Sequence, residues 1–164
     1  MREKSLRLYK IDINYIKYLY SFDNRVQFNP NNDDDYSAKR PYLGVILDIN
    51  NFEYFVPLEH PRLAHQKMKN NIFLFKIHSG KYGILGFNNM IPVNKEQLVD
   101  FDINEKSEKY KQVLISQYHF CNKHIEEIRK KAMATYCKRE CNNFLKKICC
   151  DFRLLEEKAI QYKE

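Results

Sequence analysis

The first part of the chain alternates short apolar runs with turn formers, which is the pattern of β-strands joined by tight turns. The clearest runs cover residues 42–49 and 52–58, with the turn formers Asn50-Asn51 between them. We expect these two runs to pair as an antiparallel hairpin. Further strands are predicted over residues 5–11, 72–78, 82–87 and 90–93.

Helical periodicity appears once early in the chain and dominates after residue 94. The early helix is predicted over residues 13–22, where Asp12 can cap the first turn. Its buried stripe is predicted to include Ile16 and Tyr20, with Tyr15 lying off that stripe. The later pattern predicts a short helix over 95–100, a helical stretch over 110–147 that breaks near 133–136, and a last helix over 152–162.

These segments predict an α+β fold in a single domain over residues 1–164. The β-rich part, residues 1–93, is expected to form a strongly bent antiparallel β-sheet or a partly open barrel, because its strands are short and joined by tight turns. Residues 94–164 supply a C-terminal helical half. A chain of 164 residues is long enough to bury a hydrophobic core.

Composition favours a polyanionic partner. The net charge is +7 and the pI is about 9.1, and each Lys or Arg placed on a phosphate releases condensed counterions. The chain also holds 12 Tyr and 11 Phe, and exposed rings beside cations stack unpaired bases. No apolar run approaches the roughly 20 residues that a membrane span needs, and the basic N-terminus lacks a secretory signal, so we expect a cytoplasmic protein without a membrane partner.

The cysteines and histidines do not follow a metal-binding pattern. Cys137 and Cys141 lie four residues apart and Cys149 is next to Cys150, and neither spacing matches a zinc knuckle or a redox CxxC pair. We expect reduced thiols, no metal site and no cofactor. The phosphate-loop, dinucleotide-binding, zinc-protease and serine-hydrolase motifs are also missing from the sequence, which argues against those enzyme classes.

Charged residues flank both strands of the predicted hairpin at the end away from its turn. Lys39 and Arg40 precede the first strand, while Glu59, His60 and Arg62 follow the second. If the strands pair, these side chains meet at one lip. Arginines hold a phosphate through paired donors, and an imidazole or a carboxylate transfers protons near neutral pH. The grouping therefore suits phosphodiester chemistry, although His60 as an ordinary exposed turn residue remains an alternative.

Other residues are candidates for contacting the nucleic acid. Tyr15 and Tyr36 are expected to be exposed and to stack a base or bind a phosphate, with partial packing of Tyr15 as the alternative. His65 is a secondary candidate near the lip, and Lys39 lies at its start. The helical half carries an excess of cations that suits an RNA backbone, although a solvated face is the usual role of such residues: Lys123, Arg129, Lys130, Lys131, Lys138, Arg139, Lys146 and Lys147.

Several blocks of the chain, taken in order, resemble one family. They are Tyr15 to Leu19, then Tyr36 with the run from Lys39 to Leu47, then Tyr54 with Pro57-Leu58 and Pro61-Arg62, and finally Cys150 to Lys158. In these blocks the chain is similar to the ToxN/AbiQ endoribonuclease toxins of type III toxin–antitoxin systems. The resemblance covers nearly the whole sequence.

The resemblance implies a bent barrel-like core of the kind seen in MazF-like toxins. It implies metal-independent, sequence-selective cleavage of single-stranded RNA that leaves a 2′,3′-cyclic phosphate and a 5′-hydroxyl. The implied partner is a small RNA antitoxin, cut by the toxin from a precursor of tandem repeats. Its pseudoknotted units stay bound in a closed protein–RNA assembly. Such systems arrest growth, often in defence against phage.

The resemblance also implies a site, which maps onto Tyr15, Tyr36, Arg40, Glu59, His60 and Arg62. The family commonly has Thr-Ser before the proline and Lys after it, whereas this chain has Glu59-His60 and Arg62. We predict that His60 transfers the proton, that Arg40 and Arg62 hold the phosphate, and that Glu59 orients His60 or acts as a second acid–base group. A non-catalytic RNA-binding module is the alternative, and no helix-turn-helix spacing supports a DNA-binding regulator.

Overall fold

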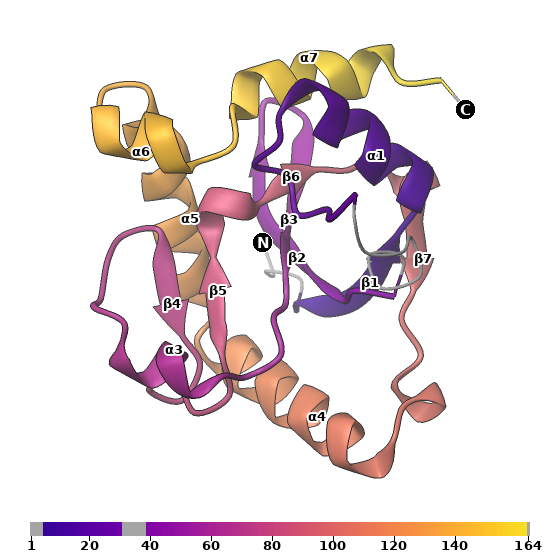
Figure 1. Ribbon diagram of the computed structural model, residues 1–164, viewed down its shortest axis with the longest axis vertical. Coiled ribbons are helices and arrows are strands. Elements are labelled where there is room, and N and C mark those ends of the chain that lie inside the picture. Colours follow the sequence, from indigo (N-terminus) through magenta and orange to yellow (C-terminus); the bar gives the residue numbers. More distant parts are fainter. Residues whose placement is uncertain (1–4, 31–38, 164) are drawn as a thin grey trace.

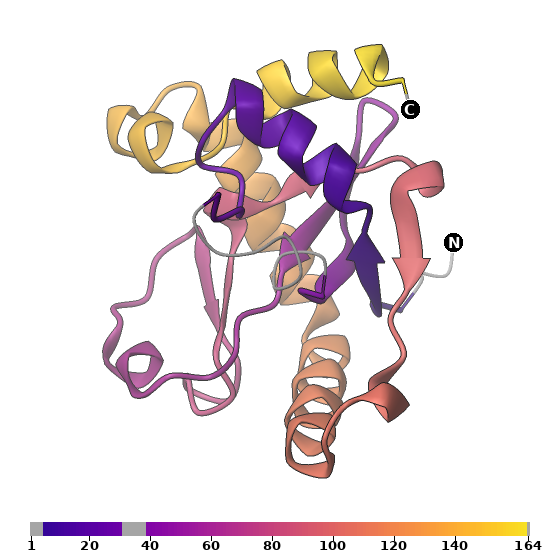
Figure 2. The ribbon, with the colours of Figure 1, turned by 45° about the vertical axis from the view of Figure 1, so that its right-hand side comes forward.

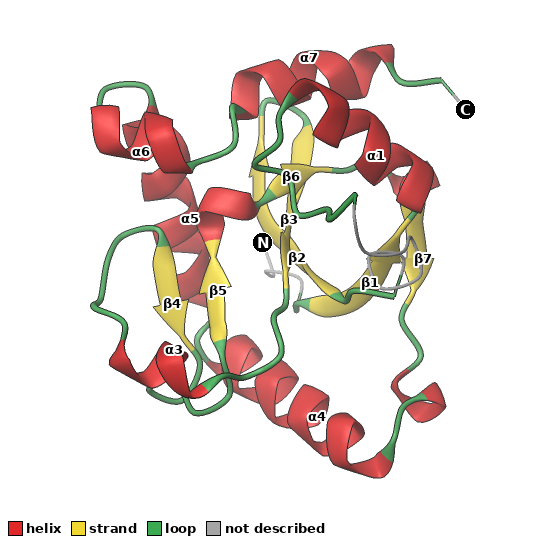
Figure 3. Cartoon of the chain, viewed as in Figure 1, coloured by secondary structure: helices red, strands yellow, loops and turns green. Residues whose placement is uncertain are grey.

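The computed structural model describes residues 5–30 and 39–163, and its centre is a curled sheet of five strands (Figure 1). In chain order the strands are β1 (Arg7–Ile11), β2 (Tyr42–Ile49), β3 (Phe52–Pro57), β6 (Ile91–Pro92) and β7 (Leu98–Asp100). Their order in the sheet is β6-β3-β2-β1-β7, and all neighbours are antiparallel. Figure 3 shows this sheet bending into a half-barrel, with helices around it. The predicted α+β class and bent antiparallel sheet are confirmed.

The β2–β3 hairpin forms as predicted. Asn50 and Asn51 both have positive φ angles, 55° and 68°, which is the conformation that a two-residue hairpin turn requires and that Asn tolerates. At the other end of the hairpin, Tyr42 pairs with Pro57. The register shifts between Leu43 and Leu47, so the turn and this irregularity together decide which residues meet at the open end.

A second, two-stranded sheet consists of β4 (Leu74–Lys76) and β5 (Ile84–Gly86). These strands are shorter than predicted, because residues between them form a wide turn in which His78, Ser79, Gly80 and Gly83 all have positive φ angles. The hairpin stands beside the short helix α3 (Leu63–Lys67) in Figure 1. A single bridge, from Leu58 to Leu85, links it to the chain leaving β3.

The main helices are α1 (Ile13–Phe22), α4 (Glu108–Lys123), α5 (Ile125–Arg139), α6 (Asn143–Ile148) and α7 (Phe152–Gln161). Asp12 caps α1 as predicted, since its carboxylate accepts the Asn14 N–H at 3.1 Å. The predicted break near 133–136 is wrong. The chain instead breaks at His124 and again between α5 and α6, where the Asn142 side chain accepts the Leu145 N–H and starts a new helix.

The segment after β6 also differs from the prediction. Residues 95–100 do not form one helix: a 3₁₀ turn over Lys95–Gln97 leads into β7, which pairs with β1. The sheet therefore takes its last strand from the part of the chain predicted to be helical. Two further 3₁₀ turns cover Phe87–Asn89 and Ile103–Glu105. No helix among the described residues is long and apolar enough to cross a bilayer.

The first and last helices of the chain, α1 and α7, lie side by side in both views (Figures 1 and 2) and contact each other. The last helix also contacts β6, while α5 packs against β2. One cluster of buried apolar residues runs through these elements, from Leu6 in the N-terminal segment to Ala159 in α7. The hydrophobic core thus needs both ends of the described chain.

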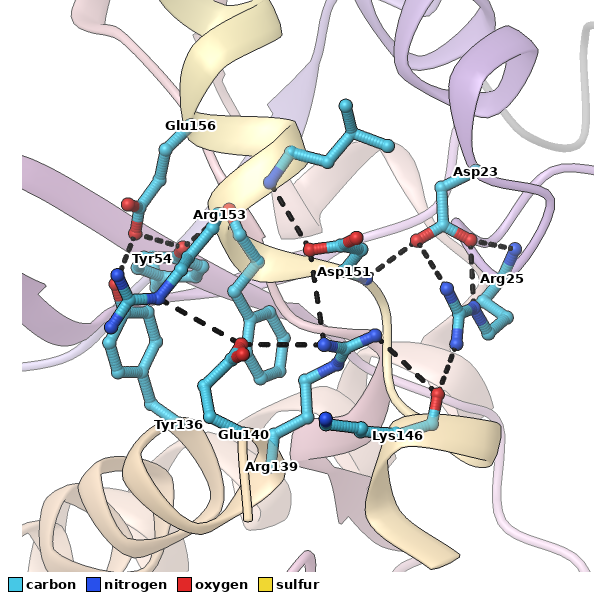
Figure 4. Close-up of polar contacts among 12 residues, drawn as sticks. Asp23, Arg25, Tyr54, Tyr136, Arg139, Glu140, Lys146, Asp151, Arg153 and Glu156 are labelled. Atoms are coloured by element: carbon cyan, nitrogen blue, oxygen red, sulfur yellow. Dashed lines mark hydrogen bonds and ion pairs between the residues drawn. The ribbon is translucent and has the colours of Figure 1, made fainter. Parts of the chain in front are cut away.

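Polar contacts fasten α7 to the rest of the fold (Figure 4). The hydroxyls of Tyr54 on β3 and Tyr136 on α5 both donate to Glu156 Oε2, at 2.6 and 2.7 Å. Burial and the neighbouring Glu156 carboxylate raise the pKa of Tyr136 to about 12. At the start of α7, the Asp151 N–H donates to Asp23 Oδ2 at the end of α1, at 2.6 Å. These contacts fix α7 relative to the sheet and to α1.

Candidate active site

The open end of the β2–β3 hairpin brings the predicted charged segments together at the level of the backbone. Tyr42 pairs with Pro57, and the Leu58 N–H donates to the Pro41 carbonyl at 2.9 Å. Continuing this register by one step places Arg40 opposite Glu59. Lys39, just before, is exposed. The two strand ends therefore converge as the sequence predicted.

A carboxylate, a guanidinium and an imidazole meet where the chain passes from β3 into α3. Glu59 Oε2 lies 3.3 Å from Arg62 Nη2 and 3.4 Å from His65 Nε2. The Arg62 side chain is 64% exposed and that of Glu59 27% exposed, whereas the His65 side chain is fully buried. In this cluster the Glu59 carboxylate contacts the buried His65 ring on its protein side and the exposed Arg62 guanidinium on its solvent side.

The hydrogen bonds around His65 assign its protonation state. The backbone N–H of Arg62 donates to His65 Nδ1 at 3.0 Å, so Nδ1 carries a lone pair and the neutral ring has its hydrogen on Nε2. That hydrogen points to Glu59, and the approach of Arg62 Nε to His65 Nε2 at 3.3 Å is then between two donors. Burial, and next the positive charge of Arg62, lower the pKa of His65 below its usual value, against the opposing effect of Glu59.

His65, which the sequence predicted to contact RNA, lies in the interior of this structure. Its side chain has no exposed surface, because the ring bonds the first turn of α3 and the β4–β5 turn covers the helix. Gly80, with φ +89°, lies so close that an added Cβ would be 2.6 Å from the His65 carbonyl oxygen. The sequence signal for this packing was weak, because α3 is too short to show a helical period.

His60 points away from this cluster in its described contacts. Its ring packs edge-on against Tyr110 of α4, with centroids 5.5 Å apart, and the residue is exposed. Successive side chains of an extended segment point to opposite sides, so Glu59 faces α3 while His60 faces α4. The predicted role of His60 in proton transfer is not tested by this geometry.

A residue missed as functional, Gln117 of α4, holds the Glu59 backbone. Its side-chain amide donates to the Glu59 carbonyl at 3.2 Å and to the Tyr82 carbonyl at 2.9 Å. Gly83 packs closely against the same Glu59 carbonyl: if Gly83 had a Cβ atom, that atom would lie 3.2 Å from the carbonyl oxygen. The sequence did contain a sign of this role, because Gln117 is a polar residue on the otherwise apolar stripe of the predicted helix.

Arg40 and Tyr15, two further predicted site residues, are both at least partly buried. Arg40 is half-buried, and its charge lies near enough to the buried Tyr42 hydroxyl to counteract the rise that burial causes in the pKa of that hydroxyl. Tyr36 lies outside the described residues. Tyr15 is fully buried, and its hydroxyl donates to the Pro92 carbonyl at 2.6 Å. The expectation that Tyr15 is exposed is wrong, because α1 is covered by α7 and by the C-terminal Tyr162, whose ring lies 5.0 Å away.

Replacing Tyr15 by Phe tests this structural role. The change leaves the Pro92 carbonyl without its buried donor, so we expect the free energy of unfolding to fall by about 1–3 kcal/mol. Denaturant unfolding followed by circular dichroism measures the loss. Binding of single-stranded RNA by the folded variant is expected to stay unchanged. Weaker binding at unaltered stability would restore the RNA-contacting role.

The buried neutral ring of His65 makes stability depend on pH. An imidazole in the unfolded chain has a pKa of about 6.5, whereas the pKa of the folded state is lower. Below about pH 6.5 the unfolded state therefore takes up a proton that the folded state does not, and the free energy of unfolding falls until the folded-state pKa is reached. We expect His65→Gln to flatten this part of the curve in urea titrations at several pH values. An identical slope in the variant would assign the pH dependence to other groups.

The described residues offer few side-chain groups that could bind a metal ion or take part in redox chemistry. Within residues 5–30 and 39–163, no three His, Cys, Asp or Glu side chains lie close enough together to share a metal ion. All five cysteines are free thiols, of which Cys137 and Cys141 are exposed.

The family model described as "Toxin ToxN, type III toxin-antitoxin system" matches residues 7–160. The chain belongs to this family. It is 34% identical to the endoribonuclease ToxN of Bacillus thuringiensis subsp. kurstaki, over 96% of this chain and 84% of that protein. It is 30% identical to the endoribonuclease AbiQ of Lactococcus lactis subsp. lactis, over 98% of this chain and 91% of that protein.

Solved structures of this ToxN family agree with the fold described above. AbiQ, a lactococcal anti-phage endoribonuclease of a type III system, superposes with a TM-score of 0.80 at 28% identity, covering 97% of this chain and 98% of the other. A second structure comes from a type III system whose toxin is selectively inhibited by a non-coding RNA pseudoknot. It has a TM-score of 0.79 at 32% identity, and it covers 98% of this chain and 99% of the other. The bent sheet and its helices are therefore those of the family.

Proposed function

We propose that this ToxN-family protein is the endoribonuclease toxin of a type III toxin–antitoxin system, and that it cuts single-stranded RNA with sequence selectivity. Family membership and the named activity of its relatives support this reading. The observation that carries it in this chain is the shared Glu59 oxygen, which contacts both Arg62 and His65 at the open end of the hairpin. A solvent-facing guanidinium beside an oriented carboxylate suits a phosphodiester.

In the proposed reaction the 2′-hydroxyl of one ribose attacks its neighbouring phosphorus. Glu59 accepts the hydroxyl proton, Arg62 and Arg40 bind the phosphate oxygens as negative charge develops, and the bond to the 5′-oxygen breaks. His60, after its ring turns from Tyr110 toward the bound phosphate, gives a proton to that leaving oxygen. The products are a 2′,3′-cyclic phosphate and a 5′-hydroxyl. His65 touches no substrate in this scheme: it is a positioning residue that orients Glu59.

The proposed roles leave no step that requires a metal ion, so we propose metal-independent cleavage. The base, the acid and the phosphate-binding cations are all side chains of this chain. The site differs from the common family pattern of Thr-Ser and Lys, because Glu59 and His60 replace hydroxyls with stronger acid–base groups.

The proposed partner is a small RNA antitoxin, processed from a repeat precursor and bound as pseudoknotted units in a closed protein–RNA assembly. The net charge of +7 and the exposed Lys39 at the lip support an RNA partner. We propose a cytoplasmic location, where RNA is made and translated, and a role in growth arrest and phage defence. We also propose one domain over residues 1–164, supported by the core that runs from Leu6 to Ala159.

Incubating the purified protein with single-stranded RNA in EDTA tests the function. We expect shortened RNA whose new 3′ ends resist ligation until the cyclic phosphate is removed and whose new 5′ ends accept a phosphate from a kinase. Bound but intact RNA would support the non-catalytic RNA-binding alternative. Cleavage restored only by added Mg²⁺ would overturn the metal-independent mechanism.

A further inference from the structure

A cavity of about 450 Å³ lies between the β4–β5 hairpin and the junction of α4 with α5. The cavity is separate from the Glu59 cluster, but consecutive residues of α3 belong to the two places. His65 contacts Glu59, and Gln66 lines the cavity. The β4–β5 turn joins the two places as well, because Gly80 presses on the His65 backbone and Ser79 lines the cavity.

One side of the cavity is an aromatic wall. Phe120 and His124 stand one helical turn apart, with ring centroids 4.4 Å apart and planes inclined by 34°. Phe75 is buried and lies 6.1 Å from each of them. Both Phe120 and His124 are half-buried, so they keep surface open to the cavity. Because the Phe120 and His124 rings pack on each other at this distance, the pair can offer one outer ring face to an unpaired base.

Polar residues also line the cavity and can recognise the edge of a base. Gln66 and Asn70 are exposed side-chain amides, and Ser79 adds a hydroxyl. An amide carries both donors and acceptors, which is the combination that pairs with the edge of a nucleobase.

Two lysines and one carboxylate, Glu127, also line the cavity; Glu127 lies 3.8 Å from His124 Nδ1, and the two ammonium groups bond backbone carbonyls. Lys131 Nζ donates to the carbonyls of Leu74 and Asn71, at 2.9 and 3.3 Å. Lys76 Nζ donates to the Gln66 carbonyl at 3.3 Å. Each ammonium has three N–H donors, so beyond these described contacts each retains a donor for a phosphate.

We propose that this cavity binds one unpaired nucleobase of the RNA substrate, on a nucleotide close to the scissile bond, and so contributes to sequence selectivity. The proposal rests on the function proposed above. The outer face of the Phe120–His124 ring pair stacks on the base, Gln66 and Asn70 bond its edge, and Lys131 and Lys76 hold the phosphate beside it. The shared helix α3 sets the spacing between this base and the phosphate held at Arg62.

A scan with abasic nucleotides tests the cavity. A cleavable single-stranded RNA is prepared in versions that each lack one base near the cut, and kcat/KM is measured with the full-length protein and with Phe120→Leu. We expect removal of one particular base to lower kcat/KM of the unmodified protein about 10- to 100-fold. Phe120→Leu should show a similar loss on intact RNA and almost no further loss with that abasic version.

Matched variants separate stacking from folding. Phe144→Leu changes an exposed phenylalanine of α6 and is expected to behave like the unmodified protein. Asn70→Ala changes an exposed residue, so we expect this variant to remain folded. Asn70→Ala should lose kcat/KM mainly through KM and change the preferred base at the same position. If Phe120→Leu is folded and fully active, or if its loss multiplies with every abasic loss, the cavity does not bind a base. If the unmodified protein cuts no RNA, the proposed function itself fails.

Discussion

Glu59→Gln is expected to lower the rate constant for RNA cleavage by about 10²- to 10⁴-fold, because an amide cannot accept the 2′-hydroxyl proton. The substitution keeps the size of the side chain and its ability to accept hydrogen bonds from Arg62 and His65. RNA affinity should therefore change little. Single-turnover cleavage assays, with affinity measured separately by fluorescence anisotropy, distinguish the two effects.

The control for Glu59→Gln is Glu157→Gln, which removes the same charge from an exposed position on α7. It is expected to cleave at the normal rate. His60→Ala belongs in the same series, with the exposed His119→Ala as its match. Loss of the alkaline limb of the pH–rate profile in His60→Ala would support its role as the acid. If Glu59→Gln cleaves normally, the proton acceptor lies elsewhere.

Arg62→Met is expected to slow cleavage by about 10²- to 10³-fold, since the guanidinium stabilises the charge that develops on the phosphate oxygens. Met preserves much of the side-chain stem, and the Arg62 backbone N–H still donates to His65 Nδ1. The fold is thus expected to remain intact, as thermal unfolding would show. Arg62→Lys should recover part of the rate, because a point charge replaces a paired donor.

Arg153→Met is the matched control for Arg62→Met. Arg153 lies on α7, its side chain is 72% exposed, and its Nε approaches the Glu140 carboxylate only to 3.9 Å. Losing this charge changes the overall attraction for RNA equally but leaves the hairpin lip intact. Equal losses in the two variants would mean that Arg62 acts through general charge alone, which would contradict its assignment to the phosphate.

The sequence predicted the part of the site that depends on backbone register. The Asn50-Asn51 turn predicts the β2–β3 hairpin, and the pairing of Tyr42 with Pro57 brings the segment before β2 close to the segment after β3. The register shift between Leu43 and Leu47 had no signal in the sequence. Side-chain direction was harder to predict. His60 and His65 look equally available in the sequence, but His65 is buried because it caps a five-residue helix and lies beneath a glycine turn from another hairpin.

The features of the fold that were predicted wrongly from the sequence have a similar physical origin. Tyr15 sits at the edge of the apolar stripe of α1, and only the docking of α7 decides that it is buried. The strand β7 has three residues and gains its structure by pairing with β1. The break between α4 and α5 at His124 could not be predicted, because no Gly or Pro lies near it in the sequence. Each of these features depends on a distant partner that a local pattern does not contain.

The pairing of α1 with α7 has a consequence for synthesis. Phe152 and Leu155 of α7 are fully or almost fully buried, and Glu156 of the same helix receives both tyrosine hydroxyls. While residues 152–161 are still inside the ribosome, this helix cannot dock and the core that it covers stays open. We therefore expect the fold to close only after this helix has emerged during synthesis.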